Sequence, residues 1–132
     1  MKKSEGSIAV EALLLVPALF VFATTIVFVS RLTDASATVH RAADVAARIA
    51  SQSSQNTAVA RARTAALRTV TAASSGCTRP MVDVDRHRVQ REVHYVVRVA
   101  CTVKLDGLGL LAIRGRTVSA TSSEVVDVYT NR

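Results

Sequence analysis

The chain opens with a long apolar stretch. No residue between Ala12 and Ser30 is charged, and about 19 residues of helix extend roughly 28 Å at about 1.5 Å per residue. The hydrocarbon core of a bilayer is about 30 Å thick. The stretch is also longer than the apolar region of an ordinary secretory signal. It therefore predicts a transmembrane helix over residues 7–31, in which Pro17 is tolerated because lipid-embedded helices accommodate kinks.

The pattern then changes to Ala with scattered Arg over residues 32–75, which favours helix. Apolar positions share one helical face on either side of a polar segment at 51–57. That segment predicts either a break or a solvated turn within a longer helix. The apolar face comprises Val39, Ala43, Ala46, Ala47 and Ala50 before the polar segment, and Val59, Ala62, Ala66, Leu67 and Val70 after it.

A third pattern covers residues 76–132, where apolar and polar residues alternate as in half-buried strands. Residues 73–76 end in Gly76, which marks the stop of the helix. Strands are predicted over 81–85, 89–105 and 116–129, with a polar turn at 86–88. In the middle strand one face carries Val93, Tyr95, Val97, Val99, Cys101, Val103 and Leu105.

Together these patterns predict an α+β fold. A long N-terminal hydrophobic helix continues into an Ala-rich helix, and a small antiparallel β-sheet follows. The expected divisions are a leader over 1–6, the transmembrane helix, an extracytoplasmic helix over 32–75 and a β domain over 76–132.

Composition limits how such a domain can be stabilised. The 132 residues are 49% hydrophobic but only 4% aromatic, with no Trp. Once the membrane segment is set aside, the remainder is close to the size at which a single core is marginal. We therefore expect a disulfide, a partner or the membrane to contribute to stability.

The net charge of +7 comes almost entirely from Arg, since Lys occurs only at Lys2, Lys3 and Lys104. The Arg residues are spread along the chain, and no aromatic platform accompanies them for base stacking. This distribution favours a solvated basic face that meets acidic lipid or an acidic partner, and it does not predict nucleic-acid binding. Lys2 and Lys3 also favour a cytoplasmic N-terminus, although Arg31 beyond the apolar stretch weakens that asymmetry.

Two cysteines are present, Cys77 beside the predicted turn and Cys101 in the strongest strand. A disulfide between them suits an extracytoplasmic domain. It would close a loop of about 25 residues and contribute about 3 kcal/mol in the chain-entropy model. Two free thiols are the alternative.

Candidate chemistry is otherwise sparse. His40, His87 and His94 show no zinc-type spacing with Cys or acids. Residues 107–112 match a loose dinucleotide fingerprint, but no βαβ unit surrounds them, so they predict a turn and bulge. No catalytic triad has supporting context. We expect no enzymatic activity, metal, cofactor or small-molecule substrate.

The residue that interrupts the apolar pattern is Glu11. A carboxylate at that depth in a membrane is costly unless it is paired, which makes it a functional candidate. The alternative is that Glu11 lies at the head-group boundary, near a helix N-terminus where negative charge is favoured. Spacing bears on this choice, because a short basic leader ends at Gly6 and cleavage before Ser7 would place Glu11 fifth in the mature chain.

This arrangement resembles the prepilin and pseudopilin leader. The segment GSIAVEALLLVPALF over 6–20 is similar to the start of TadE-like proteins of the tight-adherence (Flp-type) pilus system. The Ala- and Arg-rich helix, the Val-rich strands and the ending over 105–124 also resemble that family. Major Flp pilins carry Tyr after the Glu, whereas Ala12 stands here, and the leader lacks the run of Arg found in many relatives. The resemblance therefore implies a minor, pseudopilin-like subunit.

The resemblance also implies roles for particular residues and partners. A prepilin peptidase would cut between Gly6 and Ser7. Glu11 would pair with the new amine of a neighbouring subunit, so that two charges costly alone in lipid become tolerable together. The partners would be other pilus or pseudopilin subunits, the membrane assembly machinery and membrane lipid. The protein would be single-pass in the cell membrane, with its C-terminal domain outside the cytoplasm, or incorporated in a surface pilus.

Two alternatives remain open at this point. Residues 35–37 offer an A-x-A signal-peptidase site, and cleavage after Ala37 would release a secreted binding protein. An uncleaved single-pass anchor could instead serve another envelope complex. The N-terminus of the mature protein distinguishes the three hypotheses: Ser7 for the prepilin, Thr38 for the secreted protein and Met1 for the uncleaved anchor.

Overall fold

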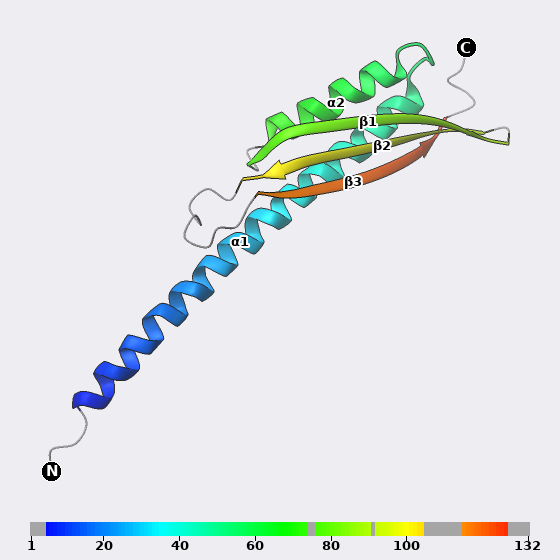
Figure 1. The fold of residues 1–132 in the computed structure, drawn as a ribbon. Helices are drawn as coiled ribbons and strands as arrows, with labels where there is room; N and C mark the ends of the chain where they lie inside the picture. Colours follow the sequence, from blue (N-terminus) through cyan, green and yellow to red (C-terminus); the bar gives the residue numbers. More distant parts are fainter. Residues whose placement is uncertain (1–4, 74–75, 91, 105–114, 127–132) are drawn as a thin grey trace. The chain divides into compact units, whose positions relative to one another are not determined.

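The structure is a computed structural model that describes residues 5–73, 76–90, 92–104 and 115–126, with side chains described from Val10 onward. Two helices precede three strands in the chain (Figure 1). Their bounds are α1 Glu5–Gln52, α2 Ala58–Ala72, β1 Cys77–Val89, β2 Glu92–Val103 and β3 Arg116–Val125. The predicted α+β class is confirmed. The chain divides into two units, Met1–Ser30 and Arg31–Arg132.

The helical part of the second unit is a hairpin with a short break. Helix α1 ends at Gln52 and α2 begins at Ala58, so the segment at 51–57 is a break between two helices and not a solvated turn within one longer helix. Thr57 and Ala58 donate backbone hydrogen bonds to the Ser54 carbonyl, both at 2.9 Å. The Ser and Thr residues favour this turn because their hydroxyls compete with helical hydrogen bonds.

The sheet is antiparallel, with the order β1-β2-β3. Gly76 has a φ of 66° where the chain passes from α2 to β1, a conformation that glycine adopts without steric cost. A bulge between Thr78 and Met81 shifts the β1–β2 register, and within it Arg79 has a φ of 51°.

The turn predicted at 86–88 is wrong. Arg86, His87 and Arg88 are strand residues that face Tyr95, His94 and Val93 across the ladder. Pairing continues to Val89 and Glu92, so the chain reverses after Val89 and not at 86–88. A run of polar residues is typical both of a turn and of a strand exposed on both faces, so polarity alone does not distinguish a turn from such a strand.

One face of the sheet packs against Arg31–Gln52 of α1 and against α2. The buried side chains come from both helices and from β2, and they form one cluster. Ala predominates on the helices, whereas β2 contributes Tyr95 and Val. The helical face predicted before the break is fully buried. After the break Ala62, Ala66 and Val70 are buried, but Val59 is 41% exposed and the buried first-turn residue is Ala58.

The middle strand agrees with its predicted pattern. Residues Tyr95, Val97, Val99, Cys101 and Val103 are buried, each at most 1% exposed, while the alternate residues lie on the other face. Leu105, and residues 127–129 of the predicted third strand, lie outside the described residues. The core is thus a layer of small helical side chains against a β-branched strand, as expected for a chain with few aromatics.

Candidate membrane and assembly segment

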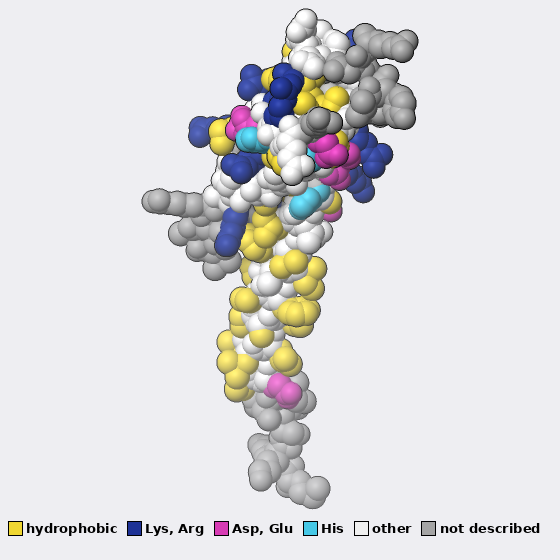
Figure 2. Space-filling model, turned by 90° about the vertical axis from the view of Figure 1, so that its right-hand side faces the viewer, with side chains coloured by type: hydrophobic (Ala, Val, Ile, Leu, Met, Phe, Trp, Pro, Cys, Tyr) yellow, Lys and Arg dark blue, Asp and Glu magenta, His cyan; other side chains and the backbone are white. Residues whose placement is uncertain are grey.

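Large apolar side chains along the N-terminal stretch of α1 are exposed, as the face in Figure 2 shows, and consecutive residues such as Leu13–Val16 and Leu19–Phe22 carry them around the helix. Leu13 is 76% exposed, Phe20 66% and Val29 50%. A helix that is apolar all round belongs in a protein core or in a membrane. Because none of its most apolar window is buried within the chain, this stretch needs an apolar environment from outside.

Among the described residues, α1 is the helix that is long and apolar enough by length and composition to cross a membrane. Pro17 lies inside it. This finding and the exposure of the apolar side chains fit a membrane-anchored protein.

Two hydroxyls in this stretch donate hydrogen bonds to carbonyls of the same helix. The Thr24 hydroxyl donates to the Phe20 and Val21 carbonyls at 3.0 and 2.8 Å, and the Thr25 hydroxyl donates to the Val21 carbonyl at 2.8 Å. In lipid an unsatisfied hydroxyl costs free energy, so these internal bonds remove one obstacle to insertion.

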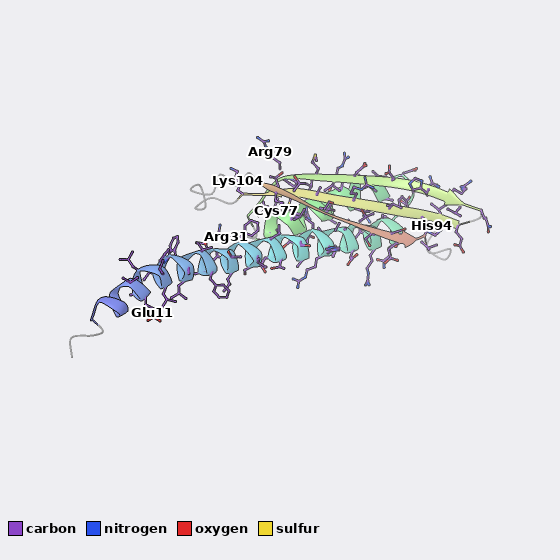
Figure 3. All side chains as sticks on the ribbon, turned by 60° about the horizontal axis from the view of Figure 1, so that its bottom comes forward. Glu11, Arg31, Cys77, Arg79, His94 and Lys104 are labelled. Atoms are coloured by element: carbon purple, nitrogen blue, oxygen red, sulfur yellow. A yellow bond between two sulfur atoms is a disulfide. The ribbon has the colours of Figure 1, made fainter. Side chains whose placement is uncertain are left out.

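Glu11 projects from α1 near its beginning (Figure 3). Its side chain is exposed, and no ion pair joins it to another described side chain. Gly6 and Ser7 lie in the first turn of the same helix. About one helical turn therefore separates Ser7 from Glu11 within a chain.

The model of the family described as TadE-like protein matches residues 6–48. The similarity covers about a third of the chain. The matched region starts at Gly6, contains Glu11 and the whole apolar stretch, and ends near the C-terminus of α1. The resemblance inferred from the N-terminal residues is thereby confirmed.

The TadE-like family is structural and is involved in assembly of the tight-adherence (Flp-type) pilus, which suggests interaction with other pilus components. The match does not extend to α2 or to the sheet, so the resemblance over 105–124 stays a prediction. No curated protein and no solved structure matches the chain.

The second unit contains the predicted disulfide, which joins Cys77 at the start of β1 to Cys101 in β2. The two Cα atoms are 5.5 Å apart, within the range that disulfides span. Cys101 is 1% exposed and belongs to the core cluster, against which Cys77 packs. The bond therefore fixes the strand that follows α2 to the central strand.

Two of the histidines come together although their sequence spacing gave no reason to pair them. His87 and His94 face each other across β1 and β2, and His94 Nε2 lies 3.6 Å from Glu92 Oε2. Within the described residues no group of three or more His, Cys, Asp or Glu side chains could hold a metal ion. The remaining histidine, His40, is exposed on α1. The fingerprint at 107–112 lies outside the described residues.

The A-x-A site at 35–37 lies inside α1. Ala35 is fully buried in the second unit, and no extended segment surrounds the bond after Ala37. Signal peptidase sites follow the apolar region closely. The helical, partly buried setting of this site and its distance from the end of the apolar stretch both count against release of a soluble domain by cleavage after Ala37.

Proposed function

We propose that this chain is a minor pilin or pseudopilin-like structural component that takes part in assembly of a tight-adherence pilus. The observation that carries the proposal is the TadE-like match over 6–48, because it includes both the leader end and the apolar stretch. Residues 7–31 span the membrane, residues 32–75 and 76–132 form an extracytoplasmic head, and the N-terminus is cytoplasmic.

In this proposal a prepilin peptidase removes residues 1–6 by cutting between Gly6 and Ser7. Both residues lie in the first helical turn, where the leading N–H groups have no intrahelical partner and the helix frays at low cost. Unwinding of that turn would present the bond in extended form. N-terminal sequencing of the mature protein tests the step: Ser7 is expected, whereas Thr38 or Met1 would support the secreted or the uncleaved alternative.

Glu11 is assigned to assembly. Its carboxylate is exposed on a helix that is otherwise apolar at this level, and an unpaired charge is costly in lipid. Pairing with the Ser7 amine of a neighbouring subunit would offset that cost and set the register between two subunits. The same interaction would select correctly processed partners, since an uncleaved subunit has no amine at that position.

Replacement of Glu11 tests this assignment. Glu11→Ala and the isosteric Glu11→Gln should insert in the membrane at wild-type levels but fail to support piliation, because both remove the charge. Asp34→Asn removes an exposed carboxylate later in α1 and is the matched control. Cells that carry this variant should form pili normally. Fractionation measures insertion, and shear preparation or electron microscopy measures pili. Normal piliation in the Glu11→Ala strain would refute the role of Glu11.

A further inference from the structure

Some arginines of the head make polar contacts that join one element to another. On the side of the sheet, Arg48 Nε lies 3.9 Å from Glu124 Oε1, Arg63 donates to the Val82 carbonyl at 3.3 Å, and Arg86 donates to Gln55 Oε1 at 3.1 Å. The first contact joins α1 to β3, the second joins α2 to β1, and the third joins β1 to the turn between the helices. These three arginines therefore hold elements of the head together.

Among the described arginines without such a contact, three lie together on the helices, whereas others, such as Arg98 and Arg116, lie on the sheet. Arg41, Arg61 and Arg68 line a groove between α1 and α2, and none of them forms an ion pair with a carboxylate in the described part of the chain. The buried Ala residues of the two helices face the sheet. The residues that line the groove occupy other positions around each helix, so the groove is on the side that the sheet does not cover. Three arginines without an ion pair among the described residues therefore line two shallow, adjoining hollows that share Arg68 and Thr69.

The groove is long rather than round. One part, of 760 Å³, is lined from Val45 and Ile49 on α1 and from 57–69 on α2. A second part, of 520 Å³, continues past Arg68 and Thr69 to Thr38 on α1 and to the end of α2. Lining residues on α2 thus recur over its whole length, which is about 22 Å for 15 residues.

The floor of the groove is apolar between its cations. Val45 is 41% exposed, and Ile49, Ala60 and Ala65 lie beside it. Thr hydroxyls that reach the groove are partly used internally, as with Thr64 and Thr69, which donate to the Ala60 and Ala65 carbonyls at 2.9 Å. None of the described lining residues is acidic.

We propose that this groove docks an acidic amphipathic helix of another subunit of the pilus assembly, a partner chemistry that rests on the proposed function. An apolar strip of such a helix would cover the floor, and carboxylates at i and i+4 would meet the guanidinium groups, which bind carboxylates in bidentate geometry. Arginine suits this use because its guanidinium is weakly hydrated and planar. Elongation and an apolar floor favour a helix over a lipid head group.

Binding of a designed peptide to the full chain in zwitterionic detergent tests the proposal. The probe is a labelled helix of the length of α2, with Glu at i, i+4 and i+7 beside a Leu strip, and its control has Gln in place of Glu. Anisotropy should show binding of the Glu peptide, weakening with salt. Arg61→Gln/Arg68→Gln should lower the affinity at least about tenfold.

Matched variants separate the groove from general charge. Arg98→Gln/Arg116→Gln removes the same charge from exposed positions on the sheet and should bind the peptide as the wild type does. Ala60→Trp should block the groove without a change in charge, whereas Thr117→Trp on β3 should not. Equal loss in the sheet variant, or no binding of the Glu peptide by the wild type, would overturn the proposal.

Other anions give distinguishable outcomes. If short-chain phosphatidylglycerol or a DNA duplex binds through Arg61 and Arg68 and the Glu peptide does not, the groove is a lipid or nucleic-acid site and the proposal is overturned. Failure of peptide binding leaves the Glu11 experiment untouched, so it refutes the groove alone. Conversely, normal piliation in the Glu11→Ala strain refutes the assembly role of Glu11 and leaves the result of the peptide-binding experiment unchanged.

Discussion

Two stretches of the same helix, α1, use apolar residues in opposite ways. From Val10 to Val29 the large apolar side chains are Leu, Phe, Val and Ile, and all of them except Phe28 are at least 50% exposed. From Ala35 to Ala50 they are mainly Ala on one face, and that face is at most 1% exposed. Both stretches are helical and apolar, so helicity by itself does not tell which one leaves the protein interior.

The comparison teaches that side-chain size and angular spread decide the environment. Small residues on one face allow a helix to approach a sheet closely, and the charged residues opposite remain in water. Large residues all round leave no polar face, and a chain of this size has no core that could enclose them. The first stretch therefore calls for lipid and the second for the protein's own sheet.

A charge in the first stretch should have the largest effect. Leu19→Arg should reduce membrane insertion, because Arg at the centre of a spanning helix costs about 3 kcal/mol. Val45→Arg is the matched change in the second stretch, where the side chain is already 41% exposed, and it should leave insertion unchanged. Carbonate extraction of membranes measures both. Equal extraction of the two variants would contradict the assignment of the first stretch to lipid.

Loss of the disulfide should destabilise the head by about 3 kcal/mol, through the entropy of the unfolded chain. Cys77→Ser/Cys101→Ser or reduction should lower the midpoint of denaturant unfolding, followed by tyrosine fluorescence. The helix over the apolar stretch should persist in detergent, since the bond lies entirely in the second unit. An unchanged midpoint under reducing conditions would show that the head does not depend on this bond.

Enlarging an alanine should separate the two stretches again. Ala46→Leu should destabilise the head by about 2 kcal/mol, because overpacking forces side chains or backbone to shift. Ala46 is fully buried. Ala18→Leu, in the exposed stretch, should change the free energy of unfolding of the head by nothing measurable. Chemical denaturation in detergent measures the free energy of unfolding of both variants. Equal losses of stability in the two variants would contradict the prediction.

The smallest effect is expected at the β1–β2 turn. Gln90 has a φ of 56°, where a side chain is strained and Gly or Asn is preferred. Gln90→Gly should stabilise the head by about 0.5 kcal/mol and leave membrane insertion unaltered. Thermal unfolding measures the gain. A decrease in the melting temperature would mean that the Gln90 side chain makes a contribution that outweighs the strain.

Sequence patterns predicted the elements better than their ends. The alternation in β2 and the Ala face of α1 both located buried residues correctly, since a period of two or 3.6 reports directly which side of an element avoids water. Arg86–Arg88 was misassigned, because strand continuation there depends on pairing with 93–95 and not on local polarity. Val59 was assigned to the buried face, although packing selected Ala58 in its place.

The candidate site was also only partly predictable. Gly6, Ser7 and Glu11 stand out because their spacing is local and the charge interrupts an apolar pattern. Arg61 and Arg68 did not stand out, although both lie at helical spacing on α2. Their significance depends on Arg41, which α1 brings to the same groove across the break between the helices. Arg63 differs from its neighbours only because the Val82 carbonyl lies within reach.

By itself the sequence determined the apolar stretch long enough to span a membrane, the α+β order and the interrupting carboxylate at Glu11, because each follows from local periodicity, length or charge. Tertiary structure decided which apolar residues are buried, that Cys77 meets Cys101, and which arginines pair within the protein. Those outcomes depend on residues far apart in the chain, and close packing, rather than any local preference, brings them together.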